Sequence, residues 1–176
     1  PENNAFLGWT LKNMKTGFAA LREVMVTGYK PSVARLYDPE DGQLHFSDFA
    51  AKDDCVLLFM AEGNAGISAA TAAGIAEIVA KYHECQPVDS RLIAAWFDDL
   101  VWDESKVTRE DERIRRTRNV NRTTEISADW STINDIYEAV LPRIRREIRG
   151  ITLLGGHSSH SYINGTNMYF NYFYDL

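Results

Sequence analysis

The sequence predicts an α+β domain in which helices pack on one face of a mainly antiparallel sheet, close to a ferredoxin-like repeat. Three observations support this fold class. Runs with strand and helix periodicity follow one another, and the strand–helix–strand pattern occurs twice. The stretch "CVLLFMA" at 55–61 is apolar on both faces, which is typical of a strand in the middle of a sheet. Near the C-terminus, two strand-like runs flank Asn164-Gly165, which predicts a hairpin with a tight turn.

The first part of the chain contains three further predicted elements and a turn. Residues 4–11 have strand character, and residues 16–27 have the apolar stripe of a helix that Gly28 would end. In "PSVARLYD" at 31–38, Val33, Arg35 and Tyr37 alternate with Ala34 and Leu36, as expected of a strand. The stretch "DPEDGQ" at 38–43 has the composition of a turn.

The elements predicted after residue 61 are a helix at 68–83, a shorter helix at 90–100, a strand at 122–127 and an amphipathic helix at 130–144. The charged stretch 103–122 is either a mobile loop or an exposed helix. No segment is rich enough in linker residues to divide the chain, so we expect one domain spanning residues 1–176.

Composition narrows the class of protein. A hydrophobic fraction of 45% and a charged fraction of 25% are typical of a globular protein. No apolar run reaches the length of about 18 residues that a transmembrane segment needs, and the start has no signal-peptide pattern. Cys55 and Cys85 are too few for a disulfide scaffold, so we expect reduced thiols and a cytoplasmic location. The net charge of −6 argues against nucleic-acid binding.

The C-terminal hairpin carries most of the candidate chemistry. His160 and Tyr162 point the same way on a strand, and an antiparallel hairpin can bring either of them near Tyr169. A histidine near a tyrosine is a plausible proton-transfer pair. The alternative is that these aromatic residues only fill one side of the sheet.

Arg35 is the second candidate, because a charge flanked by apolar strand residues is costly unless it is paired or faces a site. The alternative is an arginine that reaches water or pairs with an acid. No metal site is expected: His157 and His160 would point to opposite faces of a strand, and His83 and Cys85 lack a second close pair. Phosphate-binding glycine motifs and a nucleophile elbow are also missing from the sequence.

Three stretches, in order, resemble one known family. "YKPSVARLYDPED" is similar to the P-x-S-x-R-L-x-D segment of alkyldihydroxyacetonephosphate synthases and related FAD-linked oxidases of the vanillyl-alcohol-oxidase superfamily. "TEISADW", with the helix ending "LPRIRREI", resembles their Glu-Thr-Ser-x-x-Trp segment and the basic helix after it. "SHSYINGTNMYFNYF" resembles their Ser-His-x-Tyr-x-x-Gly-x-x-x-Tyr-Phe hairpin. The matches extend from about residue 9 to the end.

This resemblance implies a C-terminal cap domain that closes over the flavin ring and binds a small-molecule or lipid-like substrate. An N-terminal domain of the same polypeptide would hold most of the FAD, so this chain would be a fragment, inactive by itself. The family's catalytic tyrosine falls on Tyr169, and its motif arginine falls on Arg35, facing the flavin. His160 and Tyr162 are the other residues expected on the flavin or substrate side.

One departure from the family bears on the substrate. The synthases carry a phosphate-binding arginine in a Tyr-x-Arg-Asp-Leu-like segment, and the comparable stretch here, "AWFDDL", places Asp98 at that position. A carboxylate repels a phosphate dianion. We therefore expect an uncharged or aromatic alcohol rather than an ether-lipid precursor, unless an arginine from 109–122 reaches the site.

Two interpretations from other functional classes stay open. One is a free-standing ferredoxin-like module that binds RNA or a small ligand without catalysis, with the aromatic strand as a stacking platform. The other is a structural domain that forms a homodimer. The acidic net charge and the lack of an RNP1-type pattern in "NMYFNYFYDL" count against RNA.

Overall fold

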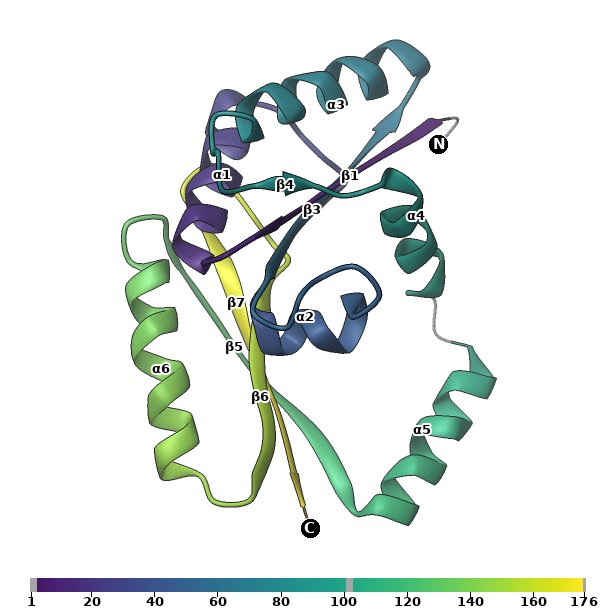
Figure 1. The fold of residues 1–176 in the computed structure, drawn as a ribbon, viewed down its shortest axis with the longest axis vertical. Coiled ribbons are helices and arrows are strands. Elements are labelled where there is room, and N and C mark those ends of the chain that lie inside the picture. The colour runs from purple at the N-terminus through teal and green to yellow at the C-terminus, as the bar shows by residue number, and fades with distance from the viewer. Residues whose placement is uncertain (1–2, 101–102, 176) are drawn as a thin grey trace.

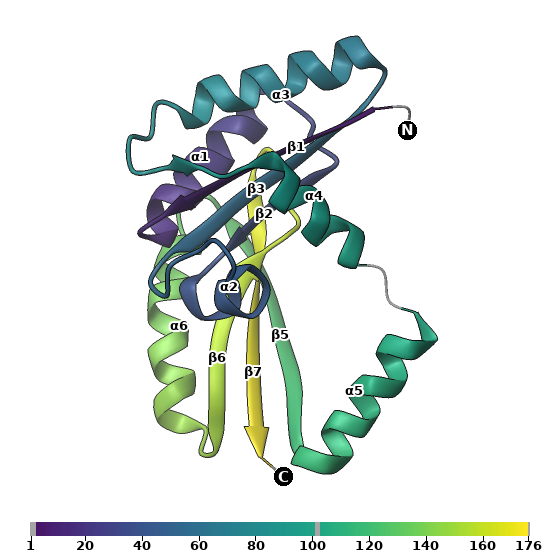
Figure 2. The ribbon, with the colours of Figure 1, turned by 45° about the vertical axis from the view of Figure 1, so that its right-hand side comes forward.

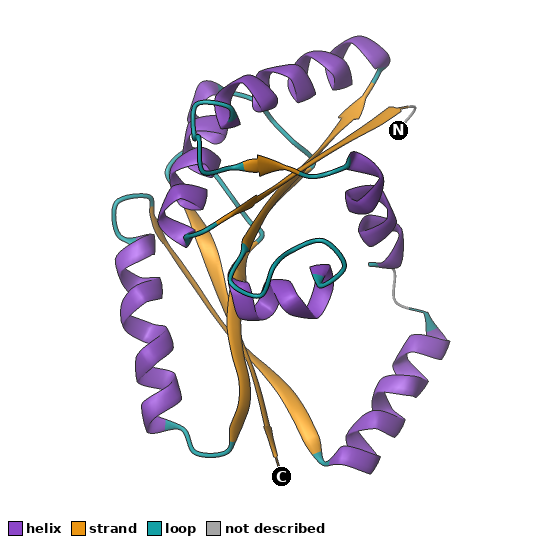
Figure 3. Ribbon diagram, in the orientation of Figure 1, coloured by secondary structure: helices purple, strands orange, loops and turns teal. Residues whose placement is uncertain are grey.

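The structure, a computed structural model, describes residues 3–100 and 103–175 (Figure 1). Helices and strands alternate along most of the chain, as Figure 3 shows by colour. The strands are β1 (Asn3–Leu11), β2 (Val33–Tyr37), β3 (Cys55–Gly63), β4 (Gln86–Pro87), β5 (Asn119–Asp129), β6 (Ile151–Ser158) and β7 (Gly165–Asp175). The helices are α1 (Met14–Thr27), α2 (Pro39–Phe46), α3 (Ala65–Val79), α4 (Ser90–Asp99), α5 (Glu104–Thr117) and α6 (Ile133–Glu147).

The described strands form one sheet in the order β4-β1-β3-β2-β6-β7-β5, and every pairing is antiparallel. Two units of the type strand–helix–strand–strand lie side by side in it. The first contains β1, α1, β2 and β3, and the second contains β5, α6, β6 and β7. The units meet between β2 and β6 (Figure 2). Only Leu36–Ser158 and Tyr37–His157 are paired there. The predicted α+β class, with its repeated unit, is confirmed.

Three long helices cover one face of the sheet. α1, α3 and α6 pack on a core to which β1, β2, β3 and β7 contribute every second residue. The buried strand side chains of this core are Trp9, Leu11, Ala34, Leu36, Cys55, Leu57, Phe59, Met168 and Phe170. The two-residue periodicity therefore leaves the side chains between them on the other face, where α2 and α4 bury a second, smaller cluster around Tyr37, Phe46 and Ile93.

The prediction of a turn at 38–43 is wrong, because helix α2 begins at Pro39. Asp38 caps this helix by accepting a hydrogen bond from the backbone N–H of Asp41 at 2.9 Å, and Pro39 occupies the first turn, where its missing N–H costs nothing. The composition is that of a turn, but the order of the residues is that of a helix start. In the charged stretch 103–122, the exposed-helix alternative holds for α5, which buries no residue, and β5 begins at Asn119.

The turn of the C-terminal hairpin also differs from the prediction. Strand β6 ends at Ser158, and the backbone N–H of Tyr162 donates to the carbonyl of Gly165 at 2.8 Å, so the tight turn is centred on Ile163 and Asn164. Gly165 is the first residue of β7, and its φ is not positive. A Cβ on Gly165 would lie 2.1 Å from the carbonyl oxygen of Ala128, so this glycine allows close strand contact instead.

No helix among residues 3–100 and 103–175 is long and apolar enough to cross a membrane.

Candidate functional site

A row of four side chains crosses the sheet on the face opposite α1, α3 and α6, part of which α2 and α4 cover. Glu125 pairs with Tyr169, Tyr169 with His157, and His157 with Tyr37, across β5, β7, β6 and β2. Directly paired residues share a face of an antiparallel sheet, so the four side chains point the same way. We call these four residues the transverse row. It crosses the junction between the two units.

At one end of the row, Arg35 and Tyr37 are held together with an aromatic side chain of α4. The guanidinium of Arg35 donates to the Tyr37 hydroxyl at 2.9 Å and lies 5.4 Å from the centre of the Trp96 ring. Burial raises the pKa of Tyr37 to about 12, against the opposing effect of Arg35. β2 is not an edge strand, and Arg35 forms no ion pair among the described residues. Its charge is therefore supported by the Trp96 ring and the Tyr37 hydroxyl.

His157 lies in the middle of the row and is held by a buried carboxylate. Its Nδ1 is 2.6 Å from Oδ2 of Asp41, a residue of α2 that is 1% exposed. Nδ2 of Asn171 donates to the same oxygen at 3.1 Å. The imidazole stacks on Tyr37, with 4.8 Å between ring centres, and its distance from the Tyr169 ring is 5.1 Å.

Tyr169 is half-buried, on the opposite face of β7 from Met168 and Phe170. The ring of His160 approaches it edge-on at 6.0 Å. Burial and the carboxylate of Glu125 raise the pKa of the Tyr169 phenol, while the charge of Arg35 acts to lower it. The phenol therefore lies among one acid, one cation and two imidazoles.

The position of His160 depends on Asn167, which is 2% exposed. The side-chain carbonyl of Asn167 accepts from the backbone N–H groups of Ser159 and His160, at 2.9 and 2.8 Å. Its amide donates to Glu125 at 2.9 Å and lies 3.1 Å from Nδ1 of His160. One buried amide thus fixes the start of the 159–164 connection beside Tyr169.

The structure brings three of the four predicted site residues to this face: Arg35, His160 and Tyr169. Tyr162 is 62% exposed near the tip of the connection, and its carbonyl accepts from the indole N–H of Trp130 at 3.1 Å. Because β6 ends at Ser158, strand alternation does not continue to residue 162. For the same reason, His157 and His160 do not point apart, as predicted, but both lie beside Tyr169.

Asp98 is exposed on α4, and the side chain that this helix places beside Arg35 is Trp96. The arrangement gives no support to Asp98 as a substrate-facing residue. Asp41, His157, Asn167 and Trp96 were not predicted as site residues. Only the HxxH spacing at 157–160 drew attention to His157. The site contacts of Asp41 and Trp96 are long-range, and those of Asn167 depend on where the hairpin turns.

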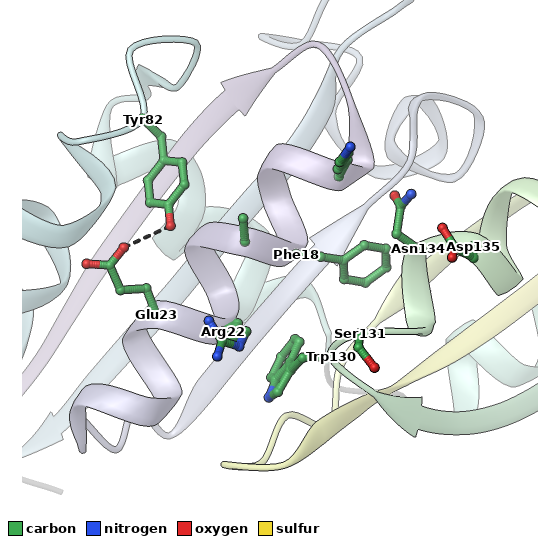
Figure 4. Close-up of a pocket in the computed structure, with 10 residues that line it drawn as sticks. Phe18, Arg22, Glu23, Tyr82, Trp130, Ser131, Asn134 and Asp135 are labelled. Carbon is green, nitrogen blue, oxygen red and sulfur yellow. Dashed lines mark hydrogen bonds between the residues drawn. The ribbon is translucent and has the colours of Figure 1, made fainter.

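A cavity of about 580 Å³ lies on the opposite face, between α1 and the start of α6 (Figure 4). Phe18, Trp130 and Arg22 line it, and Tyr82 donates to Glu23 at 2.8 Å on its far side. It contains no residue of the transverse row. Within the described residues, no group of three or more His, Cys, Asp or Glu side chains is placed to hold a metal ion.

Comparison with known proteins agrees with the family resemblance of the sequence motifs. No protein-family model matches the chain. Over its full length, the chain is 59% identical to a protein of Escherichia coli O157:H7 described as an FAD-linked oxidoreductase, YgcU, and 58% identical to its counterpart in Escherichia coli strain K12. The chain is related to FAD-linked oxidoreductases. It spans 37% of the length of either relative.

Solved structures of alkyldihydroxyacetonephosphate synthase share the fold. Two crystal forms of that enzyme match 99% and 100% of this chain with TM-scores of 0.74 and 0.76, at 15% sequence identity. The match covers 37% and 36% of the synthase chains. This likeness confirms the predicted α+β fold, and the similarity to flavoenzymes rests on the sequence identity.

Proposed function

We propose that this chain is the substrate-binding cap domain of an FAD-dependent oxidoreductase or synthase-like flavoenzyme. The observation that carries the proposal is the 59% identity, over the whole chain, to an FAD-linked oxidoreductase of which it spans only a part. Another domain of the same polypeptide, N-terminal to this one, would hold most of the FAD. The substrate would be a small or lipid-like molecule.

The side chains of the transverse row fit the ring end of a flavin rather than its pyrophosphate. The row and its neighbours Arg35 and His160 offer aromatic rings, a guanidinium and imidazoles, which suit a flat ring with nitrogen and carbonyl oxygen acceptors. The sequence lacks the glycine-rich turn whose backbone N–H groups bind a pyrophosphate. When bound, FAD would supply the redox chemistry.

In this proposal, the residues of the chain orient the substrate, exclude water and manage its proton. Tyr169 would release and take back a proton at its Oη. Arg35, supported by Trp96, would place a positive charge on the flavin side of the site. His160, fixed through Asn167, would hydrogen-bond to the substrate or to Tyr169.

Tyr169→Phe in the complete flavoenzyme tests the proposal, because it removes one oxygen and leaves the ring packing unchanged. Loss of a general acid or base lowers turnover by roughly 10²-fold or more. Tyr172→Phe is a matched control, because Tyr172 follows on the same strand and its hydroxyl lies 3.4 Å from Oγ1 of Thr124. We expect a large loss only for Tyr169→Phe, with FAD content unchanged. Equal turnover of wild type and Tyr169→Phe would refute the role of this residue.

A further inference from the structure

A buried carboxylate without a full set of partners lies behind the transverse row. Asp41 is 1% exposed, and its Oδ1 has no hydrogen-bond partner among the described residues. Its Oδ2 has two partners, His157 and Asn171. An ionised carboxylate is costly to bury unless a positive charge compensates it. One of the neighbouring groups must therefore carry that charge, or Asp41 must take up a proton.

The geometry identifies His157 as that group. Its Nδ1 is 2.6 Å from Asp41, a distance typical of a charge-assisted bond, whereas Nε2 of His45 is 4.0 Å from the other oxygen. The side chain of His157 is 15% exposed and that of His45 is 41% exposed, so solvent screens the closer pair less. The guanidinium of Arg35 donates its hydrogen bond to the Tyr37 hydroxyl and not to Asp41.

His157 also contacts the proposed proton-transfer residue directly. The two residues are paired across β6 and β7, and their ring centres are 5.1 Å apart. On the other side, Tyr37 stacks on the imidazole and prevents it from turning away. A positive charge at this distance stabilises a phenolate, and the carboxylate of Glu125, paired with Tyr169 from β5, destabilises it.

We propose that Asp41 and His157 act as a positioning pair that keeps a positive charge against Tyr169 and thereby sets the proton affinity of its phenol. This role rests on the proposed function, in which Tyr169 exchanges a proton with the substrate. The charged or titratable groups facing the pair are Asp38, which precedes α2, His45 from α2, Arg35 and Tyr37 from β2, Tyr169 from β7, Glu125 from β5 and His160 from the 159–164 connection.

The test is an NMR titration of the complete flavoenzyme with ¹³C-labelled tyrosine, in which Tyr169→Phe assigns the signal. In Asp41→Asn, the Tyr169 phenol should ionise at a higher pH than in the wild-type enzyme. His157→Gln should also raise the pH at which the Tyr169 phenol ionises. Glu125→Gln should lower that pH.

The same variants separate this inference from the proposed function. The high-pH limb of the kcat profile should move with the phenol titration in Asp41→Asn and His157→Gln. An unchanged Tyr169 titration in folded Asp41→Asn and His157→Gln would overturn the pairing role, even if Tyr169→Phe abolishes turnover. Conversely, shifted titrations together with full activity of Tyr169→Phe would support the pair and refute the proposed function.

Discussion

Asp38 connects the two units of the chain through a single buried carboxyl. It caps α2, its backbone N–H donates to the carbonyl of Gly156 in β6 at 2.9 Å, and the hydroxyl of Tyr137 in α6 donates to its Oδ2 at 3.2 Å. Burial raises the pKa of Asp38 to about 7, although the backbone N–H of Asp41 acts in the opposite direction. At a pH between the ordinary pKa of an aspartate and this raised pKa, Asp38 therefore keeps a proton in the folded protein that it has lost in the unfolded chain.

This raised pKa predicts a pH-dependent loss of stability. Between about pH 4 and pH 7 the folded state binds more protons at Asp38 than the unfolded state, so the contribution of Asp38 falls as the pH rises. At about 1.4 kcal/mol per pKa unit, the whole change is at most about 4 kcal/mol. Urea unfolding at several pH values should show a flatter profile for Asp38→Asn than for wild type. Parallel profiles would contradict the raised pKa.

The sequence predicts candidate residues that lie in short motifs, but not contacts between residues that are far apart in the chain. Tyr169, Arg35 and His160 could be predicted because each lies in a short motif of fixed spacing. Asp41 and His157 are separated by 115 intervening residues and meet only because β2 pairs with β6. No local periodicity encodes that pairing, so the Asp41–His157 contact could not be derived from the sequence.

At the scale of elements, glycines decide how closely the strands approach. Gly165 lies against the backbone of Ala128, and Gly155 lies against α2, where an added Cβ would be 2.4 Å from the backbone nitrogen of Asp41. The predicted strands and long helices were confirmed because their apolar residues repeat with the strand or helix period. The predicted centre of the hairpin turn, Asn164-Gly165, was one residue too far along the chain, because glycine serves tight turns and close backbone contacts equally well.

Gly165→Ala should therefore destabilise the protein. Its Cβ would be 2.1 Å from a backbone oxygen that cannot move without disturbing the β5–β7 pairing. Overpacking of this kind costs about 2 kcal/mol or more. Gly66→Ala in α3 is the control: its Cβ would meet nothing closer than 3.7 Å, and alanine favours a helix. Chemical denaturation should show a lower midpoint for Gly165→Ala only; an unchanged midpoint would contradict the close contact.

At the scale of the whole molecule, the site occupies the junction of two similar units. The first unit supplies Arg35 and Tyr37, the second supplies His157 and Tyr169, and only two residue pairs of β2 and β6 join the strands between them. The sequence indicated the repeat only through the order of its predicted elements, because no repeat of the residues themselves is obvious. The side-by-side order of the units was not, because it depends on which edge strands pair.

The division between a ring-facing chain and a separate flavin-holding domain predicts a colourless protein. The 176-residue chain should purify without flavin absorbance, because it lacks a glycine-rich turn for the pyrophosphate. The full-length flavoenzyme should be yellow under the same conditions. Stoichiometric flavin in the purified 176-residue chain would contradict this division.

In the complete enzyme, we expect the face that carries the transverse row to meet the flavin. Hydroxyl-radical footprinting of that enzyme, with and without FAD, measures the accessibility of individual side chains on both faces. We expect FAD to protect Tyr169 and His160 and to leave Trp130 and Tyr82, at the cavity of Figure 4, as reactive as before. Protection of Trp130 and Tyr82, with Tyr169 and His160 unchanged, would contradict the claim.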